Sequence, residues 1–124
     1  MDVTPQLPPG GQLIQAYGDG GFRIGGQRHQ GSVLVFPQRS VAWAVTGMAD
    51  LDGGSVSAVL AETPRVEILL LGCGPRIAPP PPEFRRALRE AGIALELLDT
   101  GAACRTFNVL LGEARRVAAA LIAV

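Results

Sequence analysis

The sequence contains no lysine, two cysteines and one histidine among its 124 residues. Two cysteines and one histidine are too few for a disulfide framework or a four-ligand zinc site, so we expect neither a metal nor a cofactor. Eleven arginines balance eleven acidic residues, and no basic run is present, which argues against a nucleic-acid partner or an anionic membrane surface. Alanine and glycine are abundant, so the base composition of the genome explains the absence of lysine better than selection for bidentate arginine contacts does.

Long hydrophobic runs are also absent. The longest uninterrupted one, residues 117–124, is far shorter than the roughly 20 residues that a membrane-spanning helix needs. Residues 1–11 lack the basic, apolar and small-residue zones of a secretory signal, so we expect a flexible N-terminal segment and a cytoplasmic protein. Nearly half of the chain is apolar, which is enough to bury one core, and residues 1–124 are predicted to form one domain.

The chain is organised around residues 66–111. Residues 66–71 form a continuous apolar run, which is typical of a strand in the middle of a sheet. A helix with a proline at its first position is predicted next, because apolar residues recur at helical spacing from Phe84 to Ala91 before Gly92 ends it. Residues 93–98 then form a second strand, joined to the first as a right-handed parallel crossover. Asp99 or Thr100 can cap a further helix over residues 101–111.

The N-terminal half predicts shorter elements. Residues 13–17 and 22–24 read as a β-hairpin, residues 32–36 as a buried strand, and residues 41–45 as a strand with Trp43 in the core. His29 is expected in a solvated loop. Ser55 can cap a short helix, while Asp50 and Asp52 fit turn chemistry better than an acid–base pair. The alanine-rich tail is ambiguous, because alanine favours helix whereas a short apolar run fits a buried strand.

Several segments resemble the Mth-domain family of uncharacterised proteins, which includes mitochondrial respiratory complex I assembly factor three and the adipogenesis-associated Mth domain-containing protein. The segments that carry the resemblance are residues 69–74, 99–100, 103–110, 113–117 and 119–122, with looser similarity at Phe22, Ile24, residues 32–35, Pro37 and Trp43. The resemblance implies a three-layer α/β domain on a small mixed sheet and makes the tail a strand. Many members have threonine where this chain has Cys73.

The resemblance implies a role in respiratory complex assembly for the mitochondrial members. No arginine-rich amphipathic presequence is present, so this chain resembles a non-imported member. The favoured function is therefore a non-enzymatic interaction or assembly factor with protein partners, among them respiratory-complex subunits or other assembly factors. Its oligomeric state is left open. Glu113 with Arg115 or Arg116 is interpreted as a charge pair that closes the turn before the last strand.

The alternative function is a small anionic-ligand binder or weak enzyme at one edge of the sheet. Both parallel strands end at that edge, where open α/β sheets usually bind ligands. Backbone N–H groups of the Gly72-Cys73-Gly74 loop and of the helix start at Thr100 would hold a carboxylate or phosphate there. The remaining candidate ligand-binding residues are Arg76, Cys104, Arg105, Thr106 and Asn108. For Thr106 and Asn108, hydrogen bonding to neighbouring backbone groups is the favoured interpretation and contact with a ligand is the alternative.

A third class of function is thiol chemistry. If the two strands lie side by side, Cys73 and Cys104 come to one edge, where a helix N-terminus would favour the Cys104 thiolate. The opposing interpretation is that both cysteines are small buried apolar residues.

Overall fold

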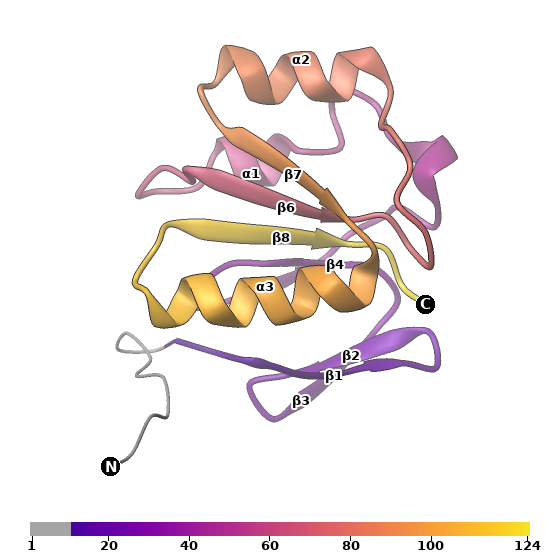
Figure 1. Cartoon of the computed structure of the whole chain (residues 1–124), viewed down its shortest axis with the longest axis vertical. Helices are drawn as coiled ribbons and strands as arrows, with labels where there is room; N and C mark the ends of the chain where they lie inside the picture. Colours follow the sequence, from indigo (N-terminus) through magenta and orange to yellow (C-terminus); the bar gives the residue numbers. More distant parts are fainter. Residues whose placement is uncertain (1–10) are drawn as a thin grey trace.

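A mixed five-stranded sheet lies at the centre of the computed structural model, which describes residues 11–124. Its strands are β4 (Val33–Val35), β5 (Ser40–Ala42), β6 (Ile68–Gly72), β7 (Ala94–Leu98) and β8 (Val117–Leu121). They lie side by side in the order β5-β4-β8-β6-β7 (Figure 1). β6 runs parallel to both β7 and β8, whereas β4 is antiparallel to β8 and to β5. The predicted α/β fold class with a small mixed sheet is confirmed.

The parallel crossover predicted at the centre of the chain is also confirmed. β6 and β7 are joined by α2 (Pro82–Glu90), which has a proline at its first position. Phe84 and Leu88 are its buried side chains, as the helical spacing predicts. Gly92 follows with a φ of 73°, a left-handed conformation that glycine adopts without the steric cost of a Cβ.

The predicted N-terminal hairpin is confirmed, and a third strand extends it into a second, smaller sheet. β1 (Ile14–Gly18), β2 (Gly21–Ile24) and β3 (Gln27–Gln30) form an antiparallel meander in that order. The loop location expected for His29 is wrong, because His29 pairs with Phe22 across β2 and β3. Gly25 and Gly26, with φ values of 55° and 83°, form a tight turn that leads back into a strand.

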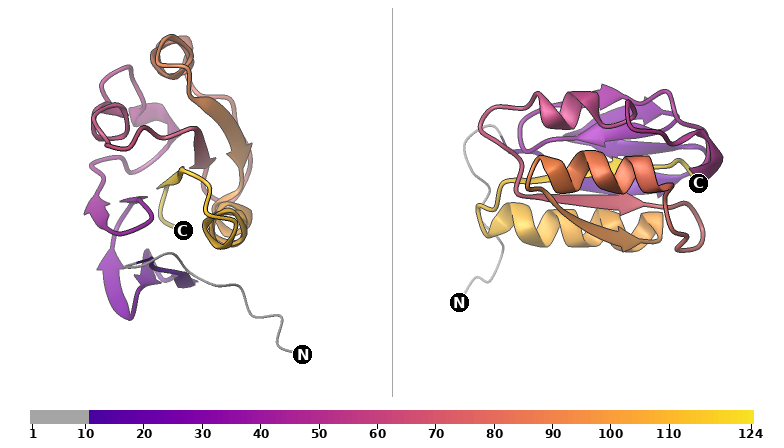
Figure 2. Two further views of the ribbon diagram at one scale, coloured as in Figure 1. Left: turned by 90° about the vertical axis from the view of Figure 1, so that its left-hand side faces the viewer. Right: turned by 90° about the horizontal axis from the view of Figure 1, so that it is seen from above.

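Two hydrophobic clusters lie on opposite faces of the five-stranded sheet, because successive strand residues point to alternate faces. Leu69, Leu71 and Cys73 belong to one cluster, which α1 (Ser57–Leu60) and α2 cover. Leu70 belongs to the other, which α3 (Thr100–Gly112) and the small sheet cover. The further helix that the sequence predicted is therefore present. Figure 2 views these layers from two further directions and supports the predicted three-layer arrangement.

The alanine-rich tail is a strand, which confirms what the family resemblance implied. Ala118, Ala119 and Ala120 in β8 are at most 1% exposed, because β8 lies between β4 and β6 with a cluster on each face. Helical propensity is worth only a fraction of a kcal/mol per residue, about 0.5, so burial and sheet hydrogen bonding outweigh it.

Three local expectations need comment. The strand predicted over residues 41–45 ends at Ala42, although Trp43 is buried as expected. Ser55 does not cap the short helix: its Oγ donates to Asp52 Oδ1 and accepts a hydrogen bond from the Asp52 N–H. Asp50 and Asp52 hold turns together, because Asp50 accepts hydrogen bonds from Thr46 and Asp52 accepts one from the Gly54 N–H.

Residues 11–124 contain neither a membrane-spanning helix nor a cluster of metal-ligating side chains. No helix there is long and apolar enough to cross a bilayer. No group of three or more histidine, cysteine, aspartate and glutamate side chains there is placed to hold a metal ion. The flexible segment expected over residues 1–11 lies, except for Gly11, outside the described residues.

Candidate functional site

The carboxyl edge of the parallel strands, where the sequence placed a ligand, is closed around the Thr100 hydroxyl. Thr100 is fully buried, and its Oγ1 accepts a hydrogen bond from the Gly74 N–H at 2.9 Å and donates one to the Ile122 carbonyl at 2.7 Å. Its backbone N–H donates to the Gly74 carbonyl at 2.9 Å. We call this arrangement the Thr100 clasp. It ties the loop after β6, the first turn of α3 and the end of β8 to one another.

The two glycines of the loop fit the clasp for different reasons. A Cβ on Gly72 would lie 3.0 Å from Leu121 Cδ2 and 3.1 Å from Thr100 Cα, which is closer than side chains normally tolerate. Gly74 has a φ of 100°, a conformation that strains any residue with a side chain. Close packing and backbone geometry therefore explain both glycines.

Several of the backbone donors proposed to hold an anion already have partners. The Cys73 N–H donates to the Leu98 carbonyl at 2.8 Å, and the Gly74 N–H is held in the Thr100 clasp. In the first turn of α3, the Ala102 N–H donates to the Asp99 carboxylate at 2.9 Å, as the predicted cap requires. Arg76 is exposed in the loop beyond Gly74. Binding of an anion by this loop stays a prediction.

Three other predicted site residues, Cys104, Arg105 and Asn108, lie along a different surface. They line a cavity of about 400 Å³ between α3 and β1, together with residues 14–17. The Arg105 guanidinium donates a hydrogen bond to the Tyr17 hydroxyl at 3.0 Å. The structure therefore divides the predicted site: Gly72, Gly74 and Thr100 come together at the sheet edge, whereas these three residues face the small sheet. Thr106 is half-buried and lines neither of the two places.

Asn108 uses its whole side-chain amide on the backbone of β1. Its Oδ1 accepts a hydrogen bond from the Ile14 N–H, and its Nδ2 donates one to the Ile14 carbonyl, both at 2.9 Å. The amide thereby makes the two hydrogen bonds that a neighbouring strand would make at the start of β1. Through this contact α3 joins the small sheet to the five-stranded sheet. Of the two interpretations offered for Asn108, hydrogen bonding to the backbone describes this contact, although the partner is distant in sequence.

Tyr17 is a residue of this surface that the sequence did not identify. A Cβ on Gly101 would lie 2.5 Å from the Tyr17 hydroxyl oxygen, so the ring can rest against α3 only because residue 101 has no side chain. A glycine in the first turn of a helix, where alanine is more stable, was the available signal of a close approach.

The two thiols do not come together. Cys73 packs with the cluster under α2, and Cys104 packs with the cluster under α3, so the sheet separates them. Burial raises the pKa of Cys104 from 9.0 to about 12, against the smaller opposing effect of the Arg105 charge. The expectation that the helix N-terminus would favour a Cys104 thiolate is therefore wrong, because desolvation is the larger effect.

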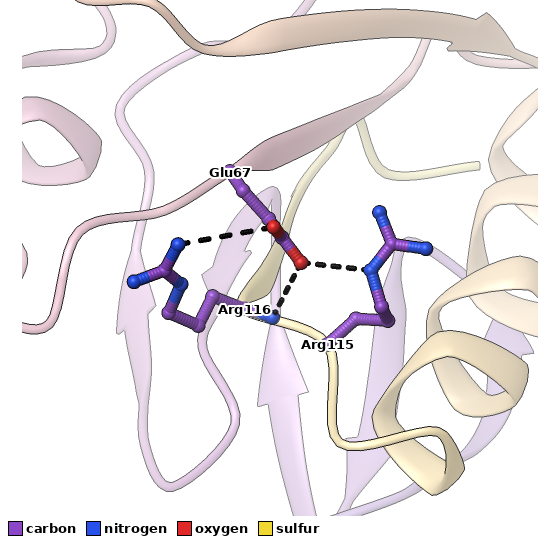
Figure 3. A network of polar contacts seen from close by, with 3 residues as sticks. All are labelled: Glu67, Arg115 and Arg116. Carbon is purple, nitrogen blue, oxygen red and sulfur yellow. Dashed lines mark hydrogen bonds and ion pairs between the residues drawn. The ribbon is translucent and has the colours of Figure 1, made fainter.

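A charged network holds the amino ends of β6 and β8 together (Figure 3). Glu67 Oε1 accepts hydrogen bonds from Arg115 Nε at 2.7 Å and from the Arg116 N–H at 3.3 Å. The Arg116 guanidinium lies 3.8 Å from Glu67 Oε2. The Arg115 hydrogen bond is the main reason that the pKa of Glu67 is lowered. The sequence predicted Glu113 as the carboxylate partner of these arginines, whereas the structure shows Glu67 in that role. Glu67 was not predicted because it lies within an apolar run that was assigned to a buried strand.

A second cavity, of about 230 Å³, lies beside this network. Apolar side chains form much of its wall, and charged side chains lie among them. Its lining residues include Pro37, Pro64, Val66, Leu111, Val117, Glu62, Arg115 and Arg116. It lies at the opposite end of the sheet from the site that the sequence predicted.

Solved structures share this arrangement of two sheets and three layers. A Bartonella henselae protein described as an outer membrane protein superposes with a TM-score of 0.85 and 42% identity, covering 96% of this chain and 99% of that one. A Bordetella pertussis protein described as a Mth938-like domain has a TM-score of 0.80 and 30% identity, covering 98% and 91%. The fold is therefore that of the Mth938-like α/β domains, as the sequence resemblance implied.

The chain belongs to the family described as "Protein of unknown function (DUF498/DUF598)", whose model matches residues 14–122. Among curated relatives, the Bos taurus protein named NADH dehydrogenase [ubiquinone] 1 alpha subcomplex assembly factor 3 is 40% identical over 122 residues, which are 98% of this chain. The chain spans 66% of the length of that relative and 60% of the Xenopus tropicalis relative of the same name.

Replacing Asn108 with alanine should lower the free energy of unfolding by about 2 kcal/mol, because the partly buried Ile14 N–H and carbonyl both lose their partner. Thr106→Ala on the same helix is the matched control and should cost under about 0.5 kcal/mol. Urea denaturation monitored by Trp43 fluorescence measures both changes. Equal stability of the two variants would contradict the role assigned to the Asn108 amide.

Cys104 should be alkylated slowly in the folded protein at pH 8. A pKa of about 12 in place of 9.0 leaves roughly a thousandfold less thiolate. Because the folded state favours the protonated thiol, the resulting stabilisation is present below pH 9 and is lost as the pH rises towards 12. Iodoacetamide labelling with peptide mapping, in buffer and in urea, separates Cys104 from Cys73. Similar Cys104 rates in both solvents would contradict this account.

Proposed function

We propose that the protein is a non-enzymatic assembly factor that binds protein partners. The observation that carries this proposal is the 40% identity to a protein named as an assembly factor, extending over 98% of this chain. Identity at that level over nearly the whole chain indicates a shared fold and supports the proposal of a shared mode of action. Because the chain spans only part of that relative, the proposal concerns the activity of this domain.

The internal use of polar groups supports the same proposal. The side chains of Thr100 and Asn108, which the sequence offered as ligand contacts, make hydrogen bonds to the protein's own backbone. Thr100 and Cys104 are buried, and burial raises the pKa of the Cys104 thiol to about 12, which disfavours the nucleophilic thiolate. Because these residues stabilise the fold, we favour binding through the protein surface as the mode of action.

The partners implied by the relatives' name are subunits of respiratory complex I or other factors that assemble it. A cytoplasmic location is part of the proposal. Such a protein would act on the cytoplasmic side of the membrane, on subunits that have not yet joined the complex.

Deleting the gene in the organism that carries it should lower the amount of assembled complex I on native gels. NADH-dependent oxygen consumption by isolated membranes should fall in parallel, because that activity requires the assembled complex. Succinate-dependent consumption, which bypasses complex I, is the control and should stay unchanged. Expression of residues 1–124 from a plasmid should restore both quantities. Normal complex I levels in the deletion strain would overturn the proposed function.

A further inference from the structure

β7 is an edge of the five-stranded sheet, and alternate residues along it have outward-facing backbone groups. The Ala94 N–H donates to the Glu67 carbonyl, and the Leu98 carbonyl accepts from the Cys73 N–H, so both residues face β6. In a parallel ladder alternate residues face the same neighbour through both backbone groups. The N–H and carbonyl groups of Leu95 and Leu97 therefore point away from β6, and no strand of residues 11–124 lies beyond them.

Arginine side chains lie beside this open edge. Arg85 and Arg89 of α2 line a shallow cavity of about 220 Å³ together with Leu88, Ile93 and Leu95. Both arginines are exposed, and neither belongs to an ion pair within residues 11–124. Figure 1 shows α2 lying alongside β7. Because Arg85 and Arg89 share a cavity with Leu95 of β7, a strand added to β7 would have these arginines on one of its faces.

The other sheet edges offer less. At β1, the Asn108 amide already occupies both backbone groups of Ile14. β5 has only three residues, and β3 contains no apolar residue. β7 has five residues and apolar side chains, and the neighbouring α2 supplies positive charge outside any ion pair, which are features that recognition by strand addition uses.

We propose that the β7 edge binds an extended acidic segment of a protein partner as an additional strand. Leu95 and Leu97 supply its backbone hydrogen bonds, and its acidic side chains lie against Arg85 and Arg89. Glu96 is exposed on the opposite face of β7, where a second acidic side chain would be repelled, so acidic and uncharged residues alternate in the bound segment. The inference rests on the proposed function only in taking a protein as the occupant.

The probe is the peptide acetyl-(Glu-Val)₃-amide, added to the ¹⁵N-labelled full chain. The amide resonances of Leu95 and Leu97 should shift and exchange more slowly with solvent, because their N–H groups become hydrogen-bonded. Acetyl-(Lys-Val)₃-amide should bind far more weakly, and so should the glutamate peptide methylated at every backbone nitrogen, because it has no N–H to donate to the Leu95 and Leu97 carbonyls. Raising the salt concentration should weaken binding of the glutamate peptide.

The double variant Arg85→Glu/Arg89→Glu should weaken peptide binding by roughly tenfold, because two favourable charge contacts become repulsive. Arg86→Glu is the matched control: Arg86 is exposed on the same helix, does not line the cavity, and should change the affinity by less than about twofold. Amide spectra of the free variants establish that each one is folded.

Besides an absence of peptide binding, three results would overturn the inference. The first is peptide-induced resonance shifts confined to β3, β5 or the other two cavities. The second is an equal loss of peptide affinity in Arg86→Glu. The third is concentration-dependent protection of the Leu95 and Leu97 amides without peptide, which would mean that a second copy of the chain covers the edge. Complex I assembly in the gene-deletion strain is measured separately. A normal deletion phenotype contradicts the proposed function, whereas absent peptide binding contradicts only the β7 site.

Discussion

The Thr100 hydroxyl is the polar group on which the arrangement of the parallel strands depends. One buried oxygen accepts the Gly74 N–H and donates to the Ile122 carbonyl, so it joins the ends of β6 and β8 at the point where α3 begins. The Gly74 N–H and the Ile122 carbonyl are both buried. A buried donor or acceptor without a partner costs about 1–3 kcal/mol. Close approach of α3 to β6 in turn requires glycine at position 72, which explains the loop sequence without a ligand.

Two further polar contacts extend this arrangement to the rest of the molecule. Asn108 holds β1 against α3, and Glu67 joins the amino ends of β6 and β8 through Arg115 and Arg116. Each contact links segments that are far apart in the chain. These polar side chains are occupied within the fold, whereas the α2 arginines Arg85 and Arg89 and the open edge of β7, where we propose that a partner binds, lie at the surface.

The sequence predicted the parts of the fold that local patterns determine. The period of apolar residues identified α2, and a continuous apolar run identified β6 as a central strand. The tail strand required the family resemblance, because alanine propensity alone favours helix. The candidate site was predicted less well, since Asn108 and Glu67 find partners 94 and 48 residues away, and no local pattern reports such pairs. The sequence analysis brought the two thiols to one edge of the sheet, because the sequence does not reveal that each cysteine packs in the cluster on a different face.

The most direct test of the account compares Thr100→Val with Thr100→Ser by equilibrium urea denaturation. Valine keeps the shape of threonine but leaves the Gly74 N–H and the Ile122 carbonyl unpaired, so it should lower the free energy of unfolding by about 2–4 kcal/mol. Serine keeps the hydroxyl and loses one buried methyl group, which should cost about 1 kcal/mol. If Thr100→Val is as stable as Thr100→Ser, the hydroxyl does not hold the strands together and the account is contradicted.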